Sequence, residues 1–200
     1  MTYIMTPAEL LTRNTAANEA YVKLHYPNEI FLSTTEQLQA ISRWTKKLIL
    51  PENVKIARSR AFIKSNEQQR TLKKELKQAG IISILGKSVF LTPEYGLYKV
   101  PETDAIIDGI PFEFRNITGQ IRKIELRFRE AKKKGNKINV FMNIEINVNI
   151  DEVKRRINLV LGRHPEYTGK IIVSLGGEPP YFWDTSTIRA ICLYKKTPAE

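Results

Sequence analysis

The stretch DAIIDGIPFEFR, residues 104–115 of this 200-residue chain, carries the pattern that decides the expected fold. The pair Asp108 and Gly109 at its centre predicts a β-hairpin closed by a two-residue turn, because both central residues of that turn need positive φ and Asp and Gly tolerate it best. We therefore expect Ile107 to lie opposite Ile110, with the rest of the two strands paired outward from that point.

The same register is expected to bring charged side chains together. It places Asp104 across from Glu113 and Glu102 across from Arg115, on one face of the hairpin. The other face is apolar and suited to a core; it holds Ala105, Ile107, Ile110, Phe112 and Phe114. Two directly opposed carboxylates, about 5 Å apart at Cβ, repel each other. A divalent cation, the Arg115 guanidinium or open solvent would offset that repulsion, so the pair is read either as a catalytic site or as the solvent-facing side of an ordinary hairpin.

Composition favours a polyanionic partner and argues against a protein that is held together by disulfides or spans a membrane. There are 32 Lys and Arg against 21 Asp and Glu, a net charge of +11, which suits nucleic acid first and an anionic membrane second. The single cysteine, Cys192, cannot form an internal disulfide and is expected to be a small buried hydrophobe. No stretch approaches the roughly 20 apolar residues of a membrane span, and the first residues, MTYIMTPAELL, lack the basic region and long apolar core typical of a signal peptide, so we expect a cytoplasmic protein without a membrane partner.

The order of expected elements gives an α+β fold with two regions. Residues 1–64 are expected to form a helical accessory region, with helices over 7–26 and from 34 or 35 to 50. Residues 65–200 are expected to form the main domain in the order α-βββ-α-β-α-β. Its first helix is capped by Ser65 and ends at Gly80, and a hairpin or bulged strand follows around Gly86. Further helices are predicted from Asn116 or Thr118 to Lys134 and after Asp151, and the sequences GKIIVSL and IRAICLY are predicted strands around the loop GGEPPYFWDTST.

Several of these motifs together resemble a known group of proteins. They are Asp104, the Asp108-Gly109 turn, Glu113-Phe114-Arg115, Thr118-Gly119, the basic run EAKKKG and the strand INVFMNI, within about 80 residues from Ile82 to Leu161. In this combination the chain resembles the C-terminal nuclease domains of contact-dependent growth inhibition and related polymorphic bacterial toxins, many of which cleave transfer RNA. The element order is similar to the restriction-endonuclease-like PD-(D/E)xK core.

That resemblance implies a toxin-like, metal-assisted nuclease with RNA, and transfer RNA in particular, as substrate. It implies that Asp104 and Glu113 bind a divalent metal, Mg²⁺ or Mn²⁺, and that Arg115 stands where the family usually has Lys. A Glu of the first helix often joins the site, for which Glu67 and Glu75 are the options. The change to Arg matters because a guanidinium with a pKa above about 12 is a poor proton acceptor, although it can stabilise phosphate charge.

A second nuclease architecture also fits, the metal-independent barnase/EndoU/colicin/RelE-like ribonuclease fold. It uses general acid and base groups, and His164, just past an expected helix end, is the candidate. The ordinary interpretation of such a histidine is a helix-dipole partner on the surface.

Further residues are candidates for binding nucleic acid, with a structural explanation open for each. A phosphate-binding track is predicted along the basic helix, and a base-stacking aromatic in the loop that follows the GKIIVSL strand. The residues are Arg122, Lys123, Arg127, Arg129, Lys132, Lys133, Lys134 and Trp183. The alternatives are a solvated helix face, an aromatic that closes the core edge, and a non-enzymatic basic binding module. An acidic immunity protein is the expected protein partner of so basic a chain.

Overall fold

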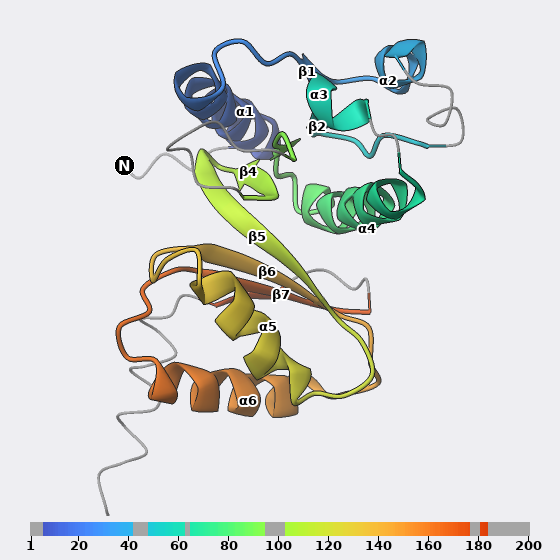
Figure 1. The fold of residues 1–200 in the computed structure, drawn as a ribbon. Coiled ribbons are helices and arrows are strands. Elements are labelled where there is room, and N and C mark those ends of the chain that lie inside the picture. Colours follow the sequence, from blue (N-terminus) through green and yellow to red (C-terminus); the bar gives the residue numbers. More distant parts are fainter. Residues whose placement is uncertain (1–5, 42–47, 63–64, 95–102, 177–180, 184–200) are drawn as a thin grey trace, which may run out of the picture. The chain divides into compact units, whose positions relative to one another are not determined.

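The structure is a computed structural model, and it describes residues 6–41, 48–62, 65–94, 103–176 and 181–183. The chain forms two compact units, which we call unit 1 (Met1–Phe112) and unit 2 (Glu113–Glu200). Both contain helices and strands, so the predicted α+β class is confirmed (Figure 1). The predicted boundary at residue 64 remains a prediction; residues before it supply two strands of the unit 1 sheet.

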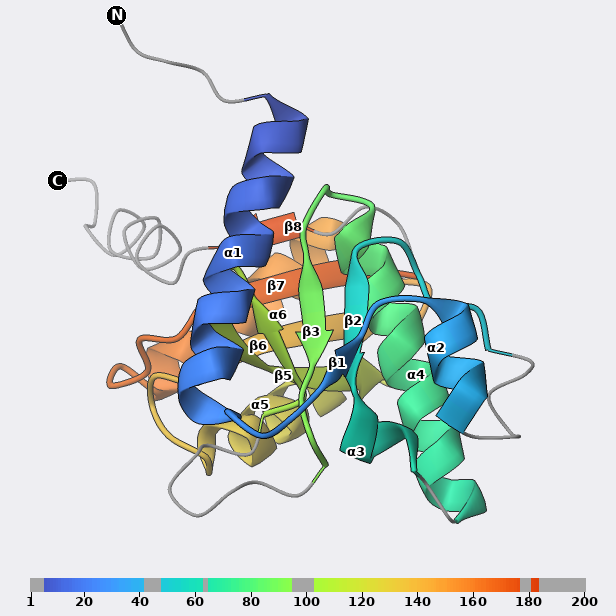
Figure 2. The ribbon, with the colours of Figure 1, turned by 90° about the horizontal axis from the view of Figure 1, so that it is seen from above.

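Unit 1 is a mixed sheet flanked by helices. Its elements are α1 (Pro7–His25), β1 (Phe31–Leu32), α2 (Thr35–Ile41), β2 (Val54–Ala57), α3 (Arg58–Ala61), α4 (Asn66–Ser83), β3 (Val89–Leu91), β4 (Ala105–Ile107) and the first residues of β5 (Ile110–Ile117). Strand β2 pairs antiparallel with β1 and parallel with β3, and β3 pairs antiparallel with β4. Helices α1 and α4 lie beside these strands (Figure 2).

Local capping signals fix where two helices begin. At the start of α1, the Thr6 side chain accepts a hydrogen bond from the Glu9 amide, and the Glu9 carboxylate accepts one from the Thr6 amide. Ser65 and Gln68 form the same reciprocal pair of hydrogen bonds at the start of α4. The end of α4 differs from the prediction: the helix runs through Gly80 to Ser83, and the turn at Gly86, φ 71°, follows it. The predicted hairpin or bulged strand around Gly86 is therefore wrong before the turn, where apolar side chains continue the buried face of the helix, and only the part after Gly86 forms a strand, β3.

The predicted hairpin register is confirmed. Strand β4 pairs with β5 so that Ile107 faces Ile110, and Asp108 and Gly109 have φ of 54° and 72°. The buried Asn18 of α1 fixes the turn, since its Oδ1 accepts from the Gly109 amide at 2.8 Å and its Nδ2 donates to the Ser88 carbonyl at 2.8 Å. A long-range side-chain contact thus supports the conformation that the turn sequence favours.

In unit 1, the face of this hairpin that carries Asp104 does not face solvent along its length, although the sequence predicted that it would. Ile106, on that side, is fully buried and packs with Val22 of α1, with Tyr26 directly after α1 and with Phe90 of β3. An alternating pattern identifies one buried face, but it does not reveal whether a helix from elsewhere covers the other.

Unit 2 places two helices on a sheet of four strands. Its elements are the rest of β5, α5 (Lys123–Lys132), β6 (Asn139–Ile144), α6 (Ile150–Arg163), β7 (Ile171–Leu175) and β8 (Tyr181–Trp183). Strands β6 and β7 are parallel, β7 and β8 antiparallel. The core gathers apolar residues of both helices and three strands, among them Ile117, Phe128, Met142, Ile157 and Val173.

Three boundaries in unit 2 correct the predictions. Helix α5 begins only at Lys123, after a turn, because Asn116 still belongs to β5; neither Asn116 nor Thr118 caps it. Asn149, and not Asp151, caps α6 by accepting from the Glu152 amide. Part of the predicted loop is strand β8. The predicted strand IRAICLY, with Cys192, lies outside the described residues. No helix in the described ranges has the length and apolar content needed to cross a membrane.

Candidate active site

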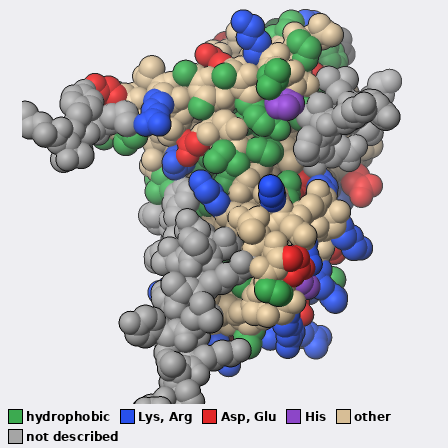
Figure 3. Space-filling view, turned by 90° about the vertical axis from the view of Figure 1, so that its left-hand side faces the viewer, with side chains coloured by type: hydrophobic (Ala, Val, Ile, Leu, Met, Phe, Trp, Pro, Cys, Tyr) green, Lys and Arg blue, Asp and Glu red, His purple; other side chains and the backbone are tan. Residues whose placement is uncertain are grey.

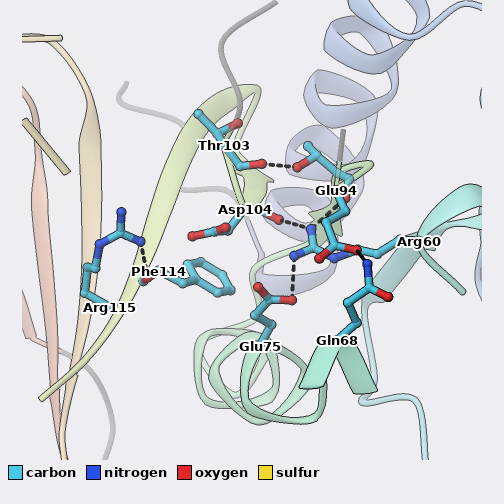
Figure 4. Close-up of polar contacts among 9 residues, drawn as sticks. Arg60, Gln68, Glu75, Glu94, Thr103, Asp104, Phe114 and Arg115 are labelled. Carbon is cyan, nitrogen blue, oxygen red and sulfur yellow. Dashed lines mark hydrogen bonds and ion pairs between the residues drawn. The ribbon is translucent and has the colours of Figure 1, made fainter. Parts of the chain in front are cut away.

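Unit 1 holds a buried charge cluster around Arg60 of α3 (Figure 4). The Arg60 side chain is 5% exposed and donates from Nη2 to Glu75 Oε2 of α4 at 2.5 Å. Its Nη1 donates to the carbonyls of Thr92 at 2.6 Å and Asp104 at 3.1 Å. One guanidinium therefore joins the end of β3, the start of β4 and the middle of α4.

Burial governs the ionisation of Glu75. The pKa of Glu75 is raised to about 7, chiefly by desolvation; Arg60 acts against this shift, and Asp104 and Glu94 add to it. The net shift of the Glu75 pKa is upward because a carboxylate with one close cation still loses most of its hydration here. Glu75, one of the two first-helix options from the sequence, therefore lies in the electrostatic field of Asp104, whereas Glu67 is exposed at the start of α4.

Asp104 is held by its backbone immediately before β4. Its amide donates to the Phe112 carbonyl at 3.0 Å, and its carbonyl accepts from the Thr92 amide at 3.2 Å as well as from Arg60. The Thr92 hydroxyl donates to the carbonyl of Thr103. Figure 4 shows the Asp104 carboxylate near this network, half-buried. Asp104 belongs to unit 1 and Glu113 to unit 2, so their convergence remains a prediction, and Glu102 lies outside the described residues.

Unit 2 has a charge cluster of its own, with Glu113 at its centre and Arg115 and Lys134 beside it. The Glu113 side chain is 0% exposed, which contradicts the expected solvent-facing position. Arg115 Nη2 lies 2.8 Å from Oε2, and Lys134 Nζ lies 2.6 Å from Oε1. A buried carboxylate without partners would be costly, and here a cation lies within ion-pairing distance of each of its two oxygens.

The two predicted metal ligands have the donor type that a divalent cation prefers. Mg²⁺ and Mn²⁺ prefer carboxylate oxygens, and Asp104 and Glu113 supply them. Lys134 and Arg115 already occupy the cation positions at Glu113. No group of three or more His, Cys, Asp or Glu suited to a metal gathers within the described residues. The metal site rests on the two predicted ligands and on no third side chain described here.

His164 lies in a separate cluster at the end of α6. Its Nδ1 is 3.1 Å from Lys132 Nζ and 3.6 Å from Glu166 Oε1, and its ring packs against Phe128. Lys132 also pairs with Glu166, and that hydrogen bond is the first cause of a lowered pKa of Glu166. The site thus combines an imidazole, an ammonium and a carboxylate on the surface of unit 2.

The basic residues predicted to bind nucleic acid gather in unit 2. Figure 3 shows Lys and Arg side chains concentrated in the lower part of the view, where α5 and α6 lie. Arg122, Arg129 and Lys133 are exposed. Trp183 is the last residue of β8, opposite Ile171, and its side chain lies outside the described set, so its predicted stacking role stays a prediction.

The sequence did not reveal Arg60 as a member of a charge cluster, nor the pairing of Lys134 with Glu113. Arg60 sits in a short segment without a motif, and only the fold brings it to Glu75. Lys134 is one of several adjacent basic residues, and its pairing with Glu113 depends on how α5 packs on the sheet.

Comparison with known proteins adds one structural likeness. No family model matches the sequence, and no curated protein matches it. One chain of a CdiA-CT/CdiI toxin and immunity complex from Burkholderia pseudomallei aligns with a TM-score of 0.46 and 19% identity, covering 62% of this chain and 91% of that chain.

Proposed function

We propose that this chain is a toxin-like nuclease that cleaves phosphodiester bonds, with RNA, and transfer RNA foremost, as its substrate. The observation that carries the proposal is the buried Glu113 held between Arg115 and Lys134. One carboxylate with two cations leaves positive charge at a site beside the basic helix α5, which suits a phosphate group. The resemblance of the sequence motifs to toxin nucleases supports the choice of reaction.

Each residue of the proposed site has a role that its surroundings allow. Asp104 and Glu113 would hold a divalent cation, whose chemistry when bound is to neutralise phosphate charge and lower the pKa of its water. Arg115 steadies the scissile phosphate, because a guanidinium stays protonated and presents several N–H donors. Of the two first-helix options, Glu75 is the one whose ionisation Asp104 influences.

One observation favours a second candidate function, a metal-independent ribonuclease. His164 beside Lys132 and Glu166 has the residue types of an acid–base site. This function needs no carboxylate pair and would depend on His164 alone among the predicted residues.

The test is cleavage of transfer RNA, ribosomal RNA and plasmid DNA by the full chain, with Mg²⁺ or Mn²⁺ and with EDTA. The variants are Glu113→Gln, His164→Ala and, as a control on α5, Glu130→Gln. We expect EDTA and Glu113→Gln to stop RNA cleavage and the control to retain it. Cleavage that survives EDTA but not His164→Ala would establish the second function. Salt-dependent binding without any cleavage would identify a non-enzymatic binding module.

A toxin role implies an inhibitor, and the charge of the chain indicates its chemistry. With +11 at pH 7, the surface suits an acidic immunity protein that associates by electrostatic attraction. We expect a small acidic protein encoded beside this chain to bind it and to suppress cleavage.

A further inference from the structure

The basic residues around α5 differ in what they can offer a ligand. Arg127 pairs with Glu130 on the helix surface at 2.8 Å, and Lys132 pairs with Glu166. Lys134 pairs instead with the fully buried Glu113. Among these three track residues, Lys134 is therefore the one that pairs with Glu113, the carboxylate on which the proposed site is built.

Exposure gives Lys134 a distinct place within that cluster. The Glu113 side chain is 0% exposed and that of Arg115 is 19% exposed, whereas the side chain of Lys134 is 33% exposed. Lys134 is thus the most solvent-accessible of these three side chains. An anion approaching the cluster from solvent would meet the Lys134 side chain before that of Arg115.

The backbone around Lys134 is fixed by the turn that ends α5. The Lys134 amide donates to the Ala131 carbonyl at 3.0 Å, and the Gly135 amide donates to the Lys132 carbonyl at 2.9 Å. Gly135 has φ 140°, which favours glycine and turns the chain away from the helix. The ammonium therefore starts from a defined position at the helix C-terminus, where cations are favoured.

We infer that Lys134, held by Glu113, binds the reacting phosphate group together with Arg115. The inference rests on the proposed function and identifies a further residue of its site. Two cations within 2.8 Å of one carboxylate leave the cluster one positive charge in excess, and a phosphodiester supplies the matching negative charge. A lysine ammonium is a compact charge on a flexible stem, so it can turn from the carboxylate toward a phosphate oxygen.

The test compares Lys134→Met with Lys137→Met, a control that removes an exposed lysine three residues further on. Binding of a 2′-O-methyl RNA oligonucleotide, which ribonucleases that use the 2′-OH cannot cleave, is measured by fluorescence anisotropy in EDTA. We expect Lys134→Met to weaken binding about 10- to 100-fold, the value of a hydrogen bond between charged groups. The control should change it about twofold. Lys134→Arg, which keeps the charge, should recover part of the loss.

The outcomes separate this inference from the proposed function. Equal effects of Lys134→Met and Lys137→Met would overturn the role of Lys134, whatever the wild type cleaves. If Lys134→Met loses binding, Lys137→Met does not, and the wild type cleaves no nucleic acid, the phosphate-binding role of Lys134 would stand and the proposed nuclease activity would be refuted. If Lys134→Met fails to fold, the double variant Glu113→Gln/Lys134→Met removes the buried charge together with its partner, and its binding decides the question in the same way.

Discussion

Replacing Glu75 by Gln should remove a pH dependence that the buried cluster of unit 1 imposes on stability. Burial raises the pKa of Glu75 from 4.5 to about 7 in the folded protein. Between these two values the folded state keeps the proton and the unfolded state releases it. The contribution to stability is thus fully present below about pH 4.5 and is lost as the pH rises through about 7.

The size of this effect follows from the pKa difference. At 1.36 kcal/mol per unit, the shift corresponds to roughly 3 kcal/mol between the two plateaus, as an order of magnitude. Glu75→Gln cannot titrate, so the difference in unfolding free energy between wild type and variant should change by this amount between pH 4 and pH 8.

The assay is urea unfolding of wild type, Glu75→Gln and Glu67→Gln at intervals across that range. Glu67 lies on the same helix and is exposed, so its variant should follow the wild type. A wild-type–Glu75→Gln difference that stays constant with pH would refute the reasoning, because it would mean that burial leaves the ionisation of Glu75 unchanged.

Two further substitutions test contacts inside each unit, one in unit 1 and one in unit 2. Arg60→Met should lower the free energy of unfolding by about 3–5 kcal/mol at pH 8, measured by urea unfolding, because it leaves Glu75 buried without its cation. The loss should be smaller at pH 5, where Glu75 takes up a proton. An equal loss at both pH values would contradict this account. Gly169→Ala should destabilise the protein by more than about 3 kcal/mol in thermal or urea unfolding, since an added Cβ would lie 1.9 Å from the Ile138 carbonyl oxygen; Gly162→Ala, where a Cβ meets nothing within 4 Å, is its control.

The sequence predicted what depends on neighbouring residues. The turn at Asp108 and Gly109 fixed the register of β4 and β5, and the Thr6 and Ser65 caps marked where two helices begin. These features follow from backbone conformation and short-range hydrogen bonds, which act over a few residues.

What the sequence did not predict depends on distant packing. Ile106 is buried because α1 covers its face, and Glu113 is buried with a lysine that lies 21 residues away. Arg60 meets Glu75 across two elements. Period and spacing carry no information on such contacts, so the sequence could name the candidate residues and place Arg115 beside Glu113, while the burial of Glu113 and its pairing with Lys134 could not be predicted.

Single-turnover cleavage of transfer RNA by wild type and Glu113→Gln, with Mg²⁺ and with folding checked by circular dichroism, tests the central claim most directly. We expect defined fragments from the wild type and a rate about a hundredfold or more lower in the variant, since Glu113 would hold the cation and orient Arg115 and Lys134. Equal rates in a folded Glu113→Gln protein would contradict a site built on this carboxylate.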